Sequence, residues 1–391
     1  MSMLAFFPWL RIKENIDLGE VELVRFIKCY RPGKNQQIYD RILESYVLRD
    51  KYNTPIKEST LLILKDKCDF QDFSEEEKNY LFSISEIIAF SGLSKREYFN
   101  TVHLGYCNRD NFAFFIQSFR QDSNDIHIVT TPRFRDCPEL HVSNKEFIPP
   151  HVSHGNFIDL DIPLVKSLMK AREDYEKWEL YNDAIFHFNL ANTDNYSISP
   201  YQEVVLIVSA FERLLDCNNK GQKREDDLIA KFLYTFKPKE DLDKNKSARI
   251  RNSKYAKSDK TLREIWLRDF YQLRGDYAHG NLSSKRSPIW KAHEHLLLGS
   301  YIFPLVVKCK LEKDGFYTLT ENDKPEISKL GIDIDMFNID VFERLVGAEL
   351  FNKTEDQSEF EWNRIRESYM LEWIKVKAME HLQQIKEIGG E

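Results

Sequence analysis

Cysteine is scarce in this chain, and the cysteines that are present are scattered. No two of them form a C-x-x-C pair, and no spacing recurs as it would in a zinc knuckle or a disulfide framework. We therefore expect them to be reduced and mostly structural. The six positions are Cys29, Cys68, Cys107, Cys137, Cys217 and Cys309.

Spacings that suit a metal ion are also rare. His151 and His154 form one histidine pair, and His293 and His295 form another. Neither pair has a third ligand nearby, and two side chains separated by one residue on a helix point apart. The sequence therefore predicts no metal and no cofactor.

Long hydrophobic runs are absent as well. The longest strongly apolar stretch, residues 204–211, is much shorter than the roughly 20 residues that a membrane-spanning helix needs. Residues 1–8 lack the basic segment and the long apolar core of a secretion signal. These features predict a cytoplasmic protein without a membrane partner.

The glycine-rich motifs of several large enzyme classes are missing. The chain has no G-x-x-x-x-G-K-[ST], no G-x-G-x-x-G and no G-x-S-x-G, so ATPase, dehydrogenase and esterase readings have no support. The formal net charge of −7 argues against a protein that coats nucleic acid over its whole surface. A length of 391 residues is enough for two or three domains.

The first part of the chain has the patterns of a β-rich module. Short β-branched or aromatic runs bounded by turn residues predict strands. A capping box of Ser74 and Glu77 predicts one helix among them. Paired prolines and a glycine in residues 147–155 mark the best boundary, so we predict a β-rich sensor or substrate-binding module over residues 1–150. The predicted strands cover residues 21–27, 60–64, 111–116 and 126–130.

The rest of the chain is predicted to be helical. Ser199, Pro200 and Gln202 make the clearest helix start, with an N-cap, a proline at the first position and a capping box. We also expect helices over about 261–277 and 289–311, the second kinked at Pro304. The predicted fold class is α+β, with a helical bundle over residues 160–312. A helical C-terminal extension over residues 316–391 is expected to end in an amphipathic helix at 359–388.

A basic stretch lies between Lys244 and Arg263, where eight lysines and arginines accompany one acidic residue, Asp259. Such a run is either a solvated loop or a rim that attracts phosphate groups. Under the second interpretation, six residues are candidates for RNA binding: Lys244, Lys246, Arg249, Arg251, Lys254 and Lys257.

Arg274 and His279 lie near the end of a predicted helix, which Gly280 and Asn281 are expected to stop. Five residues along an ideal helix correspond to a rotation of about 140°, so the two side chains would point apart. Either Gly275 loosens the helix between them, or two copies of the motif meet across a two-fold axis. The second geometry predicts a homodimer with one shared cleft.

These two residue types suit RNA cleavage without a metal. Attack of a 2′-hydroxyl on the neighbouring phosphate needs a group that titrates near neutral pH, such as histidine. It also needs a fixed cation for the charge that develops on the phosphoryl oxygens, such as arginine. DNA lacks the 2′-hydroxyl, so this chemistry selects RNA. The structural reading of the same pair is a cation that complements a helix dipole beside a histidine of the fold.

The motif resembles that of HEPN-domain proteins, and in particular of the Apea-like HEPN group. The R-x4-H pattern runs from Arg274 to His279, follows the aromatic segment 270–273 and continues into Gly280 and Asn281. Residues 209–215 resemble the first long helix of such domains. The resemblance covers roughly residues 160–312, and β-rich N-terminal extensions are familiar in the Apea-like group.

The resemblance implies an all-α, usually dimeric bundle, and a metal-independent endoribonuclease of toxin–antitoxin, abortive-infection or antiphage systems. It implies that Arg274 and His279 are the catalytic pair and that Glu212 orients Arg274, with Asp276 and Asn281 in support. The implied partners are RNA, a second copy of the chain, and an antitoxin or a phage-derived trigger.

The chain also departs from the family pattern. Many members have a polar residue directly after the arginine, where this chain has Gly275. Because many HEPN domains keep the fold without catalysis, the alternative is a silent module that binds RNA or protein and dimerises. No tyrosine lies two residues after His279, so silencing by nucleotide transfer to that tyrosine is not expected.

Overall fold

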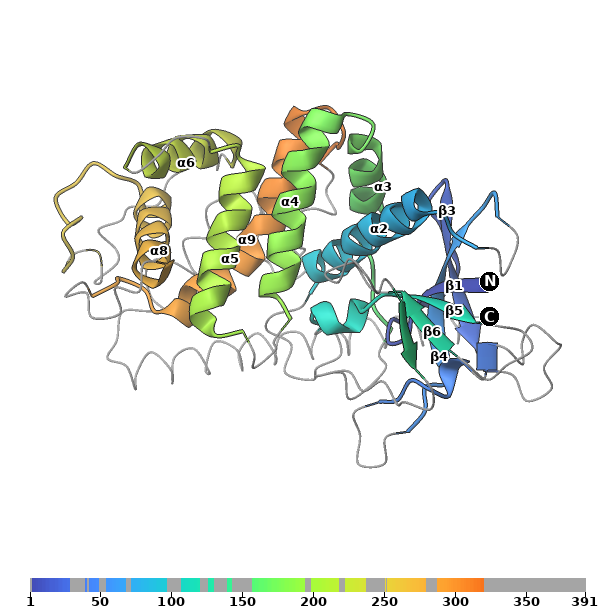
Figure 1. Ribbon diagram of the computed structural model, residues 1–391. Coiled ribbons are helices and arrows are strands. Elements are labelled where there is room, and N and C mark those ends of the chain that lie inside the picture. The colour runs from blue at the N-terminus through green and yellow to red at the C-terminus, as the bar shows by residue number, and fades with distance from the viewer. Residues whose placement is uncertain are drawn as a thin grey trace, which may run out of the picture. The chain divides into compact units, whose positions relative to one another are not determined.

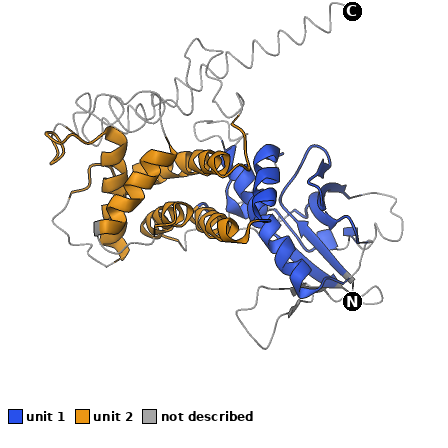
Figure 2. Cartoon of the chain, turned by 90° about the horizontal axis from the view of Figure 1, so that it is seen from above, with its two compact units in different colours: residues 1–96, 107–173, 192–197 blue, residues 97–106, 174–191, 198–391 orange. Residues whose placement is uncertain are grey.

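The chain forms two compact units, one with a β-sheet and one that is helical in its described part, in a computed structural model. Figure 2 shows the two units, which consist of residues 1–96, 107–173 and 192–197, and of residues 97–106, 174–191 and 198–391. The fold class is therefore α+β, as predicted. The structure describes residues 2–28, 39–40, 42–48, 54–67, 72–96, 107–119, 126–129, 139–142, 157–193, 198–217, 222–236, 250, 252–278 and 287–319.

The first unit is built on an antiparallel sheet that has seven strands within the described residues (Figure 1). The strand order is β2-β3-β4-β1-β5-β6-β7, and every neighbouring pair is antiparallel. The strands are β1 (Ser2–Phe7), β2 (Ile16–Asp17), β3 (Val21–Ile27), β4 (Glu58–Leu64), β5 (Phe115–Phe119), β6 (Ile126–Val129) and β7 (Glu139–Val142).

Strand β1 lies at the centre of this sheet, between β4 and β5. Its residues from Met3 to Phe7 are all buried, as expected for a strand covered on both faces. The sequence analysis tested this apolar run only as a secretion signal and did not predict a strand. It also missed β2 and β7, whereas β3, β4 and β6 lie where strands were predicted.

The predicted strand over residues 111–116 is displaced in the structure. The side chain of Asn108 accepts a hydrogen bond from the backbone N–H of Asp110 and caps a 3-10 turn, η1 (Arg109–Phe112). The turn occupies the residues expected to begin the strand, so β5 starts at Phe115 instead. Competition from a local side-chain cap explains the shift.

The first unit also contains the long helices α2 (Glu75–Ser94) and α3 (Ile162–Ala171). Helix α2 begins at the predicted capping box, in which Ser74 and Glu77 each bind the other's backbone N–H. Helix α3 packs against α2, and for this reason the first unit extends to residue 173. The predicted bundle, which starts at residue 160, included α3.

The described part of the second unit is made of helices, and α5 (Pro200–Leu214) contacts three of the others. Its start at Ser199, Pro200 and Gln202 is as predicted. Helices α4 (Tyr175–Ala191), α8 (Leu262–Ala278) and α9 (Ala292–Lys313) pack against it. Helix α6 (Gln222–Thr235), which the sequence analysis did not predict, packs on α8 and α9.

Aromatic side chains fill the core of this bundle. Phe188 of α4 and Phe303 of α9 stack with ring centroids 4.8 Å apart, and Phe211 of α5 meets the Phe303 ring edge-on at 5.2 Å. Phe232 of α6 and Trp266 of α8 extend the cluster. Aromatic contacts of this kind fix how neighbouring helices pack.

The predicted C-terminal extension lies outside the described residues, apart from the few residues that follow α9. In the described part of the chain, no helix combines the length and the apolar character needed to cross a membrane.

Candidate functional site

Arg274 lies in the last turns of α8, and the helix continues through Gly275 to Ala278 without a break. Apolar residues spaced three and four positions apart bury one face of this helix. In the folded chain 21% of the Arg274 side chain is exposed. His279 follows the last residue of α8 directly, but it lies outside the described residues, as does Asn281.

Glu212 lies in the last turn of α5 and is buried, with only 3% of its surface exposed. Arg274 Nη2 donates a hydrogen bond to Glu212 Oε2 at 3.3 Å. The structure thus brings together the arginine and the acidic residue that the resemblance paired. A carboxylate buried to this degree needs a cation beside it.

A second arginine, Arg224, contacts the same carboxylate. Its Nε lies 2.8 Å from Glu212 Oε1, so the two groups form an ion pair. The N–H does not point at the oxygen, and neither atom makes a hydrogen bond. Arg224 lies in the first turn of α6. The sequence analysis missed this residue together with its helix.

One sequence signal could have revealed α6. Leu228, Ile229 and Phe232 recur at helical spacing and are buried, and Glu225 occupies the first turn, where an acidic residue favours a helix. The many charges at the start of the segment concealed this pattern.

The charges of this cluster act on the pKa values of two further side chains, Tyr271 and Cys217. Burial raises the pKa of Tyr271, and the nearby Glu212 carboxylate raises it further. Burial also raises the pKa of the Cys217 thiol to about 12. Cys217 therefore stays protonated at neutral pH, which disfavours a role as a nucleophile.

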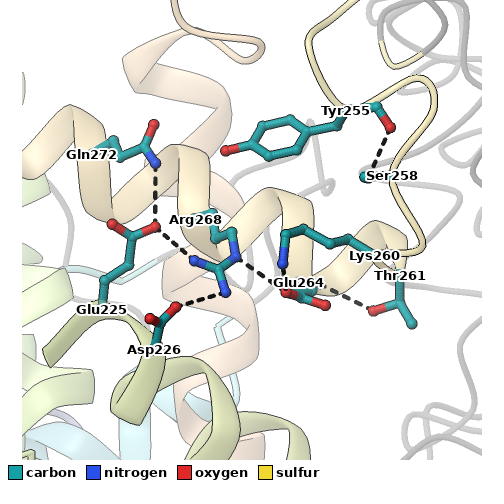
Figure 3. Close-up of polar contacts among 9 residues, drawn as sticks. All are labelled: Glu225, Asp226, Tyr255, Ser258, Lys260, Thr261, Glu264, Arg268 and Gln272. Carbon is teal, nitrogen blue, oxygen red and sulfur yellow. Dashed lines mark hydrogen bonds and ion pairs between the residues drawn. The ribbon is translucent and has the colours of Figure 1, made fainter. Parts of the chain in front are cut away.

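A network of ion pairs joins α6 to α8 beside the cluster (Figure 3). Arg268 of α8 lies within 3.1 Å of Glu225, 2.8 Å of Asp226 and 3.1 Å of Glu264. Gln272 also donates to Glu225 at 3.2 Å. These contacts hold the first turn of α6 against α8.

The basic stretch divides into residues with different roles. Arg263 is buried and donates to the backbone oxygen of Phe236 at 2.7 Å, so it belongs to the core. Lys260 pairs with Glu264 at 2.6 Å.

The candidate RNA-binding residues are only partly visible. Lys254 is exposed and reaches the Gln272 side chain at 3.2 Å, and Lys257 is exposed. The other four candidates, Lys244, Lys246, Arg249 and Arg251, lie outside the described residues.

Asp276 and its neighbours occupy the end of α8. Asp276 is half-buried, and it contributes, after burial and Tyr201, to a raised pKa of Tyr277. The rings of Tyr277 and Tyr201 lie 4.3 Å apart, which ties the end of α8 to the start of α5.

The histidines of α9 do not form a metal site. His293 is exposed, whereas His295 is fully buried, stacks on Phe270 at 4.7 Å and lies 3.1 Å from Asp269. Among the described residues, no cluster of three potential metal ligands occurs.

The described site thus consists of one buried carboxylate and two partly exposed guanidinium groups, next to the segment that holds His279. No protein-family model, no curated protein and no solved structure matches the chain.

Proposed function

We propose that the chain is a metal-independent endoribonuclease of the HEPN type, active in a toxin or antiphage role. Arg274 holds the scissile phosphate, and His279 transfers protons to and from the reacting oxygens. Attack of the 2′-hydroxyl on phosphorus expels the 5′-oxygen of the next nucleotide and leaves a 2′,3′-cyclic phosphate. The active form is a homodimer in which two copies of the motif share one cleft.

The contact between Arg274 and buried Glu212 carries this proposal. A hydrogen bond of 3.3 Å to a carboxylate in the helix core restrains the guanidinium before any RNA binds. A cation held in advance stabilises developing phosphoryl charge without first having to reorganise. The exposed remainder of the side chain is available to a phosphate.

The direct test is cleavage of a panel of RNAs by the purified full chain in EDTA. We expect products with cyclic-phosphate ends and no cleavage of DNA of the same sequence. His279→Ala should lose at least about 100-fold in rate, the usual contribution of a positioned acid or base. His293→Ala, which changes an exposed histidine of α9, is the matched control and should cut like wild type.

Equal rates for wild type and His279→Ala, whether both are active or both inert, would contradict the proposal.

A second candidate function is a silent HEPN module that dimerises and binds RNA or protein. Two observations favour it: Arg274 neutralises a buried carboxylate, as a purely structural arginine would, and Gly275 replaces a polar neighbour. Under this function Arg274→Ala weakens folding or dimerisation. An Arg274→Ala variant that melts and assembles like wild type but no longer cleaves RNA would exclude it.

A further inference from the structure

We propose that Arg224 is a second phosphate-binding residue, which together with Arg274 grips the RNA backbone at the Glu212 cluster. This inference rests on the proposed function, because it assigns the ligand of the same site. It adds a residue from α6, outside the R-x4-H motif, and predicts that two guanidinium groups contact the bound strand.

The charge balance of the cluster is the first argument. Glu212 supplies one negative charge, whereas Arg224 and Arg274 supply two positive charges around it. One cation is enough to neutralise one buried carboxylate. The second guanidinium is therefore not needed to neutralise Glu212, and it is a cation that can bind an anion at a partly exposed position.

The carboxylates next to Arg224 in the sequence pair with other cations. Glu225 and Asp226, which directly follow Arg224 on α6, both pair with Arg268. Asp227 pairs with Lys231 at 3.3 Å. Within the described residues, Glu212 is the only acidic ion-pair partner of Arg224 and of Arg274.

The accessible donors are the second argument. A guanidinium carries five N–H donors. Arg274 donates to Glu212 only through Nη2, and its Nε is buried and makes no hydrogen bond, so only its remaining Nη donors can serve a ligand. Arg224 approaches Glu212 with Nε, and among the described residues none accepts a hydrogen bond from its Nη nitrogens. In the folded chain 34% of the Arg224 side chain is exposed, so these terminal donors are open to a ligand.

A cluster in the first unit has the same charges in a different geometry. There Glu58 also pairs with two arginines, but both donate hydrogen bonds to it through Nε. Arg11 and Arg25 are each 31% exposed, close to the 34% of Arg224, but their guanidinium groups lie 4.5 and 5.2 Å from the Phe157 ring. Arg224 has no such ring contact among the described residues, whereas Arg274 lies 5.8 Å from the Tyr271 ring.

Arg224 is also held in place by its helix. Arg268 anchors the two residues that follow it, and Lys231 donates to the backbone oxygen of Asp216 at 2.6 Å, just after α5. The first turn of α6 is thereby tied to α8, and a later turn of the same helix is tied to the residues that follow α5. A cation fixed in this way loses little conformational freedom when it binds an anion.

The chemistry of two adjacent guanidinium groups selects a phosphodiester. The planar fork of arginine matches the paired oxygens of a phosphate, and two forks side by side suit a chain of phosphates better than a single small anion. The ligand is therefore the RNA backbone next to the cleaved bond.

The test measures binding separately from cleavage. The probe is a fluorescent 2′-O-methyl RNA, which lacks the attacking hydroxyl and so stays intact, and its anisotropy is followed over a range of salt concentrations. The full-length variants are Arg224→Gln, Arg224→Lys and Arg274→Gln. Arg213→Gln, an exposed arginine of α5 paired with Asp183 at 3.9 Å, is the matched control.

We expect Arg224→Gln to weaken binding several-fold and to lower the slope of log affinity against log salt by about 0.7, the value for one phosphate contact on a single strand. Arg224→Lys should keep the slope but bind more weakly, because it retains the charge and loses the fork. Arg213→Gln should match wild type. Each variant is first checked by thermal melting, and the lysine variant covers the case in which the glutamine variant fails to fold.

Any of four results would overturn the inference. Three of them are an unchanged slope in Arg224→Gln, an equal loss in Arg213→Gln, and a wild type that does not bind the probe. The fourth is a melting temperature that inorganic phosphate raises in wild type but not in Arg224→Gln, with equal RNA binding by both, because the ligand would then be a free phosphate. Arg224-dependent binding without any cleavage of ordinary RNA would instead refute the endoribonuclease proposal and leave this one standing.

Discussion

At the scale of single residues, Glu212 decides the character of the candidate site. A carboxylate with 2% of its side chain exposed cannot remain charged without a partner. Two arginines from different helices provide that compensation, at 2.8 and 3.3 Å. The residues that would bind phosphate are therefore also the residues that keep the core electrically balanced.

Because both arginines neutralise Glu212, we expect either one to preserve most of the protein's stability when the other is replaced. Arg224→Gln or Arg274→Gln alone should lower the free energy of unfolding by about 1 kcal/mol or less, because one guanidinium still faces Glu212. The double variant should lose about 3–5 kcal/mol, since a buried charge is left uncompensated. Urea denaturation followed by circular dichroism measures all three.

The control adds Glu212→Gln to the double variant. This substitution removes the unpaired buried charge and should recover most of the lost free energy of unfolding. Additive effects of the two single substitutions would mean that the arginines do not share the carboxylate.

At the scale of secondary-structure elements, α8 is the helix around which the site is arranged. One face buries Ile265, Trp266 and Phe270 in the bundle core. Another face carries Arg268, which pairs with α6. Arg274, which pairs with α5, lies further along the same helix. The helix thus joins the core to the cluster, and it stays regular through Gly275 to Ala278.

Gly275 is not needed for space in α8. A Cβ built on it meets nothing within 4 Å, so Gly275→Ala should raise the free energy of unfolding by about 0.5–1 kcal/mol through higher helix propensity. Gly299 of α9 is the contrasting control. There a Cβ would lie 2.9 Å from Ile207 Cγ2 and 3.1 Å from Phe270 Cε1, so Gly299→Ala should destabilise the protein.

Thermal melting of both variants checks this pair. A loss of stability in Gly275→Ala would show that the glycine serves something other than the described helix, such as the geometry that brings His279 to Arg274.

At the scale of the whole molecule, the formal charge of −7 means that the proposed RNA binding would have to use a local patch. The exposed lysines Lys254 and Lys257 and the Glu212 cluster all belong to the second unit. The first unit contributes an antiparallel sheet with α2 and α3, and its role as a sensor or substrate-binding module stays a prediction.

The shared-cleft geometry makes a prediction about mass. Light scattering of the purified chain should give about twice the 46.4 kDa of one copy, because two R-x4-H motifs are expected to meet across a two-fold axis. The measurement is made at the protein concentrations that support RNA cleavage. A single-chain mass under those conditions, with cleavage intact, would exclude a site built from two copies.

Much of the fold follows from local patterns in the sequence. The capping boxes at Ser74 and Ser199 start α2 and α5 as predicted, because a side chain and a backbone N–H only three residues apart decide the geometry. Strands β3 and β4 were predicted from their β-branched and apolar runs. In contrast, β1 escaped prediction because a strand buried on both faces lacks alternation, and α6 because its charged first turn obscures the apolar spacing that follows.

By itself, the sequence determined where several helices and the strands β3, β4 and β6 begin, and through the HEPN resemblance it paired Arg274 with Glu212. Only the tertiary structure decided that these two meet, and that Arg224 joins them from a helix the pattern did not reveal. The physical reason is the range of the interactions. Caps and periodicity act within a few residues, whereas the Arg274–Glu212 contact joins positions 62 residues apart and depends on how three helices pack.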